Sequence, residues 1–302
     1  MSDPAPILPR TAPPHEVLRA VLDALDHGRR VVLASVVDRH GSAPSTPGQK
    51  LVLLDERTAI GTVGGGAVER VVLERMLVAL GDPGARPRLE TFRLGASLGM
   101  CCGGSADILV EPLEPPLHVL VVGAGHVGVF TAPLLASLVF RVTLVDTREA
   151  AADPERLPPL PAAPTGVPEG VRLLHAEHDD PEVLRGLPAD LGRAAALVMT
   201  HDHALDQTVV EWALARGFGF VGGVGSRAKA ARTRDRLEAK GFSAADIARV
   251  RMPVGVDVGA RTPAEIGVAI AAELVAWRAT HARARARETA GAAPASEGRT
   301  EA

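Results

Sequence analysis

Residues 117–128 read Leu-His-Val-Leu-Val-Val-Gly-Ala-Gly-His-Val-Gly, an apolar run that ends in the pattern Gly-x-Gly-x-x-Gly. The apolar run is typical of a buried strand, and the glycines after it allow a tight turn into a helix. A second apolar run, 141–146, ends in Asp146, about where a dinucleotide-binding unit carries its ribose-binding acid. This stretch therefore predicts the first strand, turn, helix and second strand of a Rossmann-type domain.

The rest of the C-terminal half alternates strand and helix patterns, which predicts right-handed crossovers and a mostly parallel sheet. Its last helix has a clear start, because Thr262, Pro263 and Glu265 form a capping box. Further strands are expected at 171–175, 196–200 and 218–222, and helices at 181–187, 204–217, 226–241 and 263–277.

The N-terminal half predicts a smaller α/β unit with three glycine-rich loops. Apolar stripes at helical spacing mark helices at 15–28 and 67–80. Strands are expected at 30–38, 51–55, 59–63, 87–94 and 106–113. The fold class is thus α/β, with a small mixed α/β N-terminal domain at 15–113 and a Rossmann-type parallel-sheet C-terminal domain at 117–280, preceded by a flexible leader, 1–14, and followed by a disordered tail, 281–302.

Composition limits the classes of partner. The chain of 302 residues has a formal net charge of −3 and 3% aromatic residues, so neither a nucleic-acid partner nor an anionic membrane surface is indicated. No apolar run is long enough to span a membrane, and the N-terminus lacks the features of a signal peptide. The two cysteines are adjacent, which excludes a disulfide framework. We expect a cytoplasmic protein.

The first glycine loop predicts an anion site. Glycines at the start of a helix let its free amides approach a phosphate closely. The alternative is a tight turn that binds no dinucleotide, and the bulky residue at position 126 favours that alternative. The candidate residues are Gly123, Gly125, His126, Gly128 and Asp146.

A second glycine loop, before the helix at 226–241, offers another anion site. Ser226 can cap this helix, but Arg227 and Lys229 lie in its first turn, where the helix dipole disfavours cations. A bound anion between the two cations would explain them, as would extension of both side chains into solvent. Gly225 completes this candidate group.

Polar residues follow the strand at 196–200. Carboxyl ends of parallel strands face the ligand crevice, so His201, His203 and Asp206 are expected to line it. The same side chains could hold a metal ion, but a His-x-His pair without an assured third ligand is a modest signal. Polar lining that hydrogen-bonds a ligand is the favoured interpretation.

The loop between the strands at 87–94 and 106–113 contains both cysteines. A thiolate at Cys102 can contact molybdenum or another soft metal, while a small buried thiol is the alternative. Gly103 and Gly104 leave the backbone open for close approach. Hydrogen-bond donors for the same ligand are expected at Ser42, Ser45, Thr46, Gly64, Gly65 and Gly66, although each of these positions also fits a solvated turn.

Together these stretches resemble the XdhC/CoxI family over nearly all of 15–277. The N-terminal motifs are HGSAPSTPGQKLVL (40–53), GTVGGGAVE (61–69) and GMCCGGSADILVEPL (99–113). The C-terminal motifs are GAGHVG (123–128), THDHALD (200–206), GGVGSRAK (222–229) and PVGVDVGARTPAEIGVAIAAELVA (253–276). Cys102 stands at the family's Cys-Gly-Gly cysteine.

The resemblance implies an accessory protein without catalysis of its own. Such proteins bind the molybdenum cofactor transiently, allow a cysteine desulfurase to install its terminal sulfido ligand, and deliver it to a xanthine dehydrogenase-type apoprotein. A homodimer is the expected assembly. Two other functions stay open: an NAD(P)-dependent oxidoreductase using the loop at 123–128 with Asp146, and a metal-dependent hydrolase using His201, His203 and Asp206.

Overall fold

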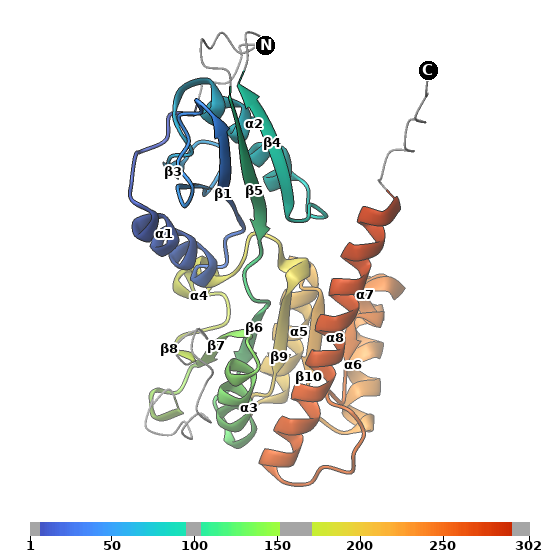
Figure 1. The fold of residues 1–302 in the computed structure, drawn as a ribbon. Helices are drawn as coiled ribbons and strands as arrows, with labels where there is room; N and C mark the ends of the chain where they lie inside the picture. The colour runs from blue at the N-terminus through green and yellow to red at the C-terminus, as the bar shows by residue number, and fades with distance from the viewer. Residues whose placement is uncertain (1–6, 95–103, 152–170, 292–302) are drawn as a thin grey trace. The chain divides into compact units, whose positions relative to one another are not determined.

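A computed structural model of the chain describes residues 7–94, 104–151 and 171–291. The chain divides into two compact units, one built mainly from Arg29–Pro115 and the other from Pro116–His281 (Figure 1). Within the described ranges, none of the helices combines the length and hydropathy that a membrane span requires.

The first unit is an antiparallel sheet with the strand order β3-β2-β1-β5-β4. Helix α2 covers one face through Val68, Val72 and Met76, and α1 packs Val17 and Val21 on strands of the same sheet. The elements are α1 (Pro14–Asp26), β1 (Val31–Gly41), β2 (Lys50–Leu53), β3 (Ala59–Gly61), α2 (Gly66–Gly81), β4 (Arg88–Leu94) and β5 (Gly104–Leu113).

The second unit contains a sheet in which every strand pair is parallel, with the order β8-β7-β6-β9-β10-β11. The predicted Rossmann-type fold is confirmed. The elements are β6 (His118–Val122), α3 (His126–Ser137), β7 (Arg141–Asp146), β8 (Arg172–His175), α4 (Pro181–Gly186), β9 (Ala194–Val198), α5 (His203–Arg216), β10 (Phe220–Gly223), α6 (Arg227–Ala239), α7 (Ala244–Ala248), β11 (Val250–Arg251) and α8 (Pro263–Gly291).

Strand order in this sheet determines where a ligand crevice lies. From β6 the chain proceeds through α3 to β7 on one side, whereas β9 pairs with β6 on the other side. The order therefore reverses between β6 and β9, and ligands of such sheets bind at the carboxyl ends of the strands beside this point. Helices α3 and α8 contribute to the core on one face of the sheet, and α4, α5 and α6 to the core on the other (Figure 1).

The last helix corrects one expectation. Its capping box is present, since the Glu265 carboxylate accepts from the Thr262 amide at 2.9 Å and the Glu265 amide donates to the Thr262 hydroxyl at 3.3 Å. The sequence predicted a disordered tail from His281 onward, whereas in the structure α8 continues to Gly291. Alanine, arginine and glutamate favour helix, and extending a formed helix avoids a new nucleation step.

Candidate functional site

Two glycines of the turn after β6 are required by the fold. Gly123 has a φ of 114°, and a Cβ there would overlap the carbonyl oxygen of Met199. A Cβ on Gly128 would overlap the carbonyl oxygen of Gly123. The turn and the start of α3 thus approach neighbouring backbone too closely for any side chain.

Gly125 differs from these two glycines. Its φ of −75° is accessible to any residue, and a Cβ built there meets no heavy atom of the described residues within 4 Å. Gly125 is the N-cap of α3 and provides no side-chain capping bond, and His126 beside it is exposed. The space next to this helix N-terminus is therefore open to a phosphate.

Asp146, at the end of β7, supports this turn from within the chain. Its buried carboxylate accepts four hydrogen bonds, one from the Ala124 amide and three from the main chain and guanidinium of Arg148. Burial alone would raise the pKa of Asp146, but the hydrogen bonds from Arg148 and Ala124 outweigh it and lower the pKa. A carboxylate has about four acceptor sites, so Asp146 has no free acceptor for a ribose hydroxyl.

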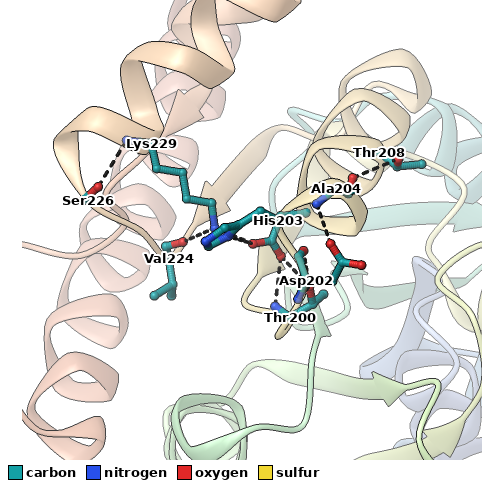
Figure 2. A network of polar contacts seen from close by, with 9 residues as sticks. Thr200, Asp202, His203, Ala204, Thr208, Val224, Ser226 and Lys229 are labelled. Carbon is teal, nitrogen blue, oxygen red and sulfur yellow. Dashed lines mark hydrogen bonds and ion pairs between the residues drawn. The ribbon is translucent and has the colours of Figure 1, made fainter.

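A second polar cluster lies where β9 and β10 end (Figure 2). The Asp206 side chain is 3% exposed and accepts hydrogen bonds from the amide and the hydroxyl of Thr200, at 3.0 and 2.8 Å. The same carboxylate forms an ion pair with Lys229, whose ammonium also donates to the Val224 carbonyl at 3.0 Å. Asp206 therefore joins the loops that follow the two strands.

These contacts change the interpretation of the second glycine turn. A Cβ on Gly225 would lie 2.5 Å from Lys229 Cδ, so this glycine leaves room for the lysine side chain. Ser226 caps α6 as expected, accepting a hydrogen bond from the Lys229 amide at 3.2 Å. Arg227 is 87% exposed. Because Asp206 compensates the ammonium of Lys229, no bound anion is needed to explain a lysine in the first turn of α6.

The two histidines of this cluster are exposed. The His203 side chain is 84% exposed, and its Nδ1 lies 3.9 Å from the Asp206 carboxylate. His201 is also exposed. Among the described residues, no group of three or more His, Cys, Asp or Glu side chains is arranged to hold a metal ion. With Asp206 bound to Lys229, the structure supplies no ligand set for the metal-hydrolase hypothesis in this part of the chain.

In the first unit, close contacts bring three loops together. A Cβ on Gly104, the first residue of β5, would lie 2.8 Å from the Ala43 amide and 3.1 Å from the Ser42 amide. A Cβ on Gly64 would lie 2.7 Å from the hydroxyl oxygen of Ser45. The loop after β1, the glycine turn before α2 and the start of β5 therefore meet at one end of this sheet.

The serines of this cluster have different roles. Ser45 is fully buried, and its hydroxyl donates to the Val63 carbonyl at 2.6 Å, so it stabilises the turn and does not face a ligand. Ser42 is exposed, as is Thr46, whose amide donates to Gln49 at 2.8 Å. Of the three hydroxyls considered, those of Ser42 and Thr46 are accessible.

The glycine turn before α2 is open on one side. Gly64, Gly65 and Gly66 have φ values of 127°, 76° and 59°, which favour glycine. Within the part of the chain that the structure describes, a Cβ on Gly65 or Gly66 meets nothing within 4 Å, and no side chain caps α2. The sequence analysis missed the hydrogen bond that stabilises this turn, in which the Thr62 hydroxyl donates to the Glu69 carboxylate at 2.6 Å. The spacing of seven residues between this threonine and the glutamate in the first turn of α2 was the pattern that could have indicated it.

The thiol loop falls in a gap between the described ranges. Cys102 and Gly103, together with Cys101, lie outside the described residues. The molybdenum contact at Cys102 stays a prediction. Gly104 is the described residue nearest to Cys102 in the sequence, and it places the end of this loop against the backbone of Ser42.

These features define a Rossmann-type domain linked to an antiparallel sheet domain with its own glycine-rich loop cluster. The model of the XdhC Rossmann domain matches residues 119–274, and that of the XdhC and CoxI family matches residues 24–93. The first match alone covers more than half of the chain, which therefore belongs to the XdhC family. The resemblance noted from the motifs is confirmed.

Two curated proteins are similar to this chain. The Escherichia coli (strain K12) protein YqeB, described as uncharacterized, is 31% identical over 249 residues, which are 80% of this chain and 42% of that protein. A Bacillus subtilis (strain 168) protein, described as a probable subunit of xanthine dehydrogenase, is 28% identical over 174 residues, or 58% of this chain and 47% of that protein. The chain spans less than half the length of either relative.

Among solved structures, one described as a xanthine dehydrogenase from Bacillus halodurans aligns with a TM-score of 0.41 and 16% sequence identity. That alignment covers 87% of this chain and 95% of the other.

Proposed function

We propose that this protein is an accessory protein for molybdoenzymes of the xanthine dehydrogenase type. It binds the finished molybdenum cofactor, holds it while a cysteine desulfurase supplies the terminal sulfido ligand, and delivers it to the apoenzyme. Membership of the XdhC family supports this role, as does the name of the Bacillus subtilis relative. The protein acts as a maturation factor and performs no catalysis of its own.

One observation carries the proposal: Gly104 and Gly64 both pack against the loop that contains Ser42 and Ser45. Gly104 follows Cys102 by two positions in the sequence, and Cys102 itself lies outside the described residues. A thiolate is a suitable ligand for a soft metal, and the exposed Ser42 can hydrogen-bond the polar part of the same ligand.

The molybdenum cofactor consists of a phosphate, a pterin with many hydrogen-bonding groups, and a dithiolene-bound metal. Its phosphate requires room beside the amides at a helix N-terminus. At Gly125, which precedes α3, and at Gly65 and Gly66, at the start of α2, a Cβ would meet no heavy atom of the described residues within 4 Å. Each unit thus offers one turn suited to a phosphate.

A dinucleotide such as NAD(P) is the alternative ligand of the Rossmann-type domain. It is less well supported, because the Asp146 carboxylate is already saturated by Ala124 and Arg148. Calorimetric titration with NADH and NADPH tests this alternative. Tight binding of either, together with turnover of an alcohol or aldehyde, would replace the proposed function by an oxidoreductase activity.

The direct test measures molybdenum and pterin in the full-length protein purified from cells that also express the cofactor pathway. We expect about one cofactor per chain in the wild type, the stoichiometry of a single built site. Cys102→Ala should lose most of it, and Cys101→Ala is the matched control that should retain it. A wild-type protein that carries no molybdenum or pterin after loading would contradict the proposal.

Delivery is tested separately from binding. The loaded protein is mixed with the apoprotein of a xanthine dehydrogenase, with and without a cysteine desulfurase and its cysteine substrate. We expect activity to appear only when the desulfurase and its substrate are present. Activity that appears equally without them would show that sulfuration does not take place on this protein.

A further inference from the structure

Asp206 and Lys229 form an ion pair that is almost withdrawn from solvent at the carboxyl edge of the parallel sheet. Their side chains are 3% and 14% exposed. Burying a carboxylate to this extent costs free energy unless a counter-charge and hydrogen bonds replace the lost water. Lys229 supplies the charge, and the amide and hydroxyl of Thr200 supply the hydrogen bonds.

The lysine points inward along its whole length. Its Cδ occupies the space where a Cβ of Gly225 would lie, and its ammonium donates to the Val224 carbonyl as well as to Asp206. An ammonium has three donors, so two of them are already used within the chain. Turning Lys229 toward a ligand would leave the Asp206 carboxylate buried without a counter-charge, which is strongly unfavourable.

Asp206, the ion-pair partner of Lys229, also stabilises the turn that precedes His203. The Thr200 hydroxyl donates its one proton to the Asp206 carboxylate and accepts from the Asp202 amide at 3.1 Å, so the turn is organised around Thr200 (Figure 2). Asp206 fixes Thr200 by two hydrogen bonds. His203 begins α5 immediately after this turn and is 84% exposed.

We infer that Lys229 is a positioning residue: it is the counter-ion of Asp206 and, through Asp206 and Thr200, sets the turn that presents His203 to a bound ligand. His203, and not Lys229, is then the member of this cluster that contacts the ligand. The ligand-binding part of this inference rests on the proposed function, whereas the positioning of the turn does not.

The test compares Lys229→Met with the double variant Asp206→Asn/Lys229→Met. The single variant removes the counter-charge, whereas the double variant removes both charges and keeps an Asn oxygen to accept from Thr200. Lys240→Met is the matched control, since Lys240 at the other end of α6 pairs with Glu211 at 2.6 Å and is 57% exposed. The readouts are the thermal unfolding midpoint and the imidazole NMR signal of His203, assigned with His203→Gln.

We expect Lys229→Met to lower the unfolding midpoint and shift the His203 signal, and the double variant to restore most of both. Lys240→Met should change neither by a comparable amount, because exposed pairs contribute little. An unchanged midpoint and His203 signal in Lys229→Met would overturn the positioning role. These two readouts require no ligand, so they hold even if the proposed function fails.

Binding of the molybdenum cofactor provides the third readout. We expect Lys229→Met to bind roughly tenfold more weakly, within the range of energies that couple neighbouring sites. The double variant should recover wild-type binding, and His203→Gln should bind weakly with an unchanged fold. If the double variant regains its stability but binds as weakly as Lys229→Met, then Lys229 contacts the ligand directly and the inference is wrong. Absence of cofactor binding by the wild type would contradict the proposed function instead.

Discussion

The imidazole Nδ1 of His118 lies 2.9 Å from the guanidinium of Arg141. Because an arginine side chain can only donate, this nitrogen must be the acceptor, and the proton of the neutral ring is on Nε2, which lies 3.0 Å from the Thr143 hydroxyl. Burial, followed by the nearby charges of Arg141 and Arg172, lowers the pKa of His118 to about 3. His118 is thus a buried neutral histidine between cationic neighbours, at the amino end of β6.

This histidine should make the protein sensitive to acid. Since the pKa is lower in the folded chain than the ordinary value of 6.5, the unfolded chain binds a proton that the folded chain does not between pH 6.5 and about 3. The free energy of unfolding should therefore fall as the pH falls through this window, by at most about 1.4 kcal/mol per pH unit from this group.

Urea unfolding at several pH values checks this expectation by comparing the wild type with His118→Gln. A Gln side chain can accept from Arg141 and donate to Thr143 but takes up no proton. The variant should show a shallower loss of stability between pH 6.5 and 4, because the remaining pH dependence comes from carboxylates. Parallel pH profiles for the two proteins would refute the role of His118.

Asp146→Ala should destabilise the second unit. The change removes the hydrogen bonds that the Ala124 amide and the Arg148 side chain donate to this buried carboxylate. Hydrogen bonds to a charged group contribute about 1.5–3 kcal/mol each, a loss that denaturant unfolding can resolve. Arg148→Ala is the control: its side chain is 43% exposed, so we expect a smaller loss. Equal losses in the two variants would mean that the Ala124 hydrogen bond contributes little.

The sequence allowed the parallel sheet to be predicted, because the apolar run before Gly123 and the later alternation of strands and helices are local patterns. The start of α8 was predictable for the same reason, since Thr262 and Glu265 are three residues apart. Its end was not, because a segment rich in alanine, arginine and glutamate is polar enough to suggest disorder and also favourable for helix.

The sequence predicted which residues belong to the candidate site but not which of their side chains contact one another. Motif spacing brought out Lys229 and Asp206, yet nothing in a span of 23 residues shows that these two side chains meet. The same limit applies to the glycines. Gly125 and Gly128 look alike in the pattern, and only the position of neighbouring backbone shows that one is required for packing and the other is open.

The serines of the first unit give a pair of variants with opposite expected effects. Ser45→Ala removes the hydrogen bond to the Val63 carbonyl inside the core and should lower the free energy of unfolding by about 1–3 kcal/mol. Ser42→Ala should leave unfolding unchanged, because Ser42 is exposed, and should weaken cofactor retention. Loss of stability in Ser42→Ala, with none in Ser45→Ala, would reverse these assignments.

Substitutions at two glycines of the turn after β6 distinguish a role in packing from a role in ligand binding. Gly128→Ala places a methyl group where the Gly123 carbonyl oxygen lies, and this neighbour is backbone, which cannot yield as the end of a flexible side chain can. Overpacking of this kind typically costs about 1–3 kcal/mol, so thermal unfolding should occur at a clearly lower temperature. Gly125→Ala adds the same methyl group in open space at a φ of −75°, and its unfolding should match that of the wild type.

Gly125→Ala should change the amount of bound cofactor although it leaves the stability of the protein unchanged. If a phosphate approaches the α3 N-terminus at Gly125, the added methyl group blocks that approach, and the purified Gly125→Ala protein should retain less pterin although it is as stable as the wild type. Undiminished pterin in Gly125→Ala would place the phosphate elsewhere. The turn at Gly65 and Gly66 is the next position to test, since a Cβ there also meets no atom of the described residues within 4 Å.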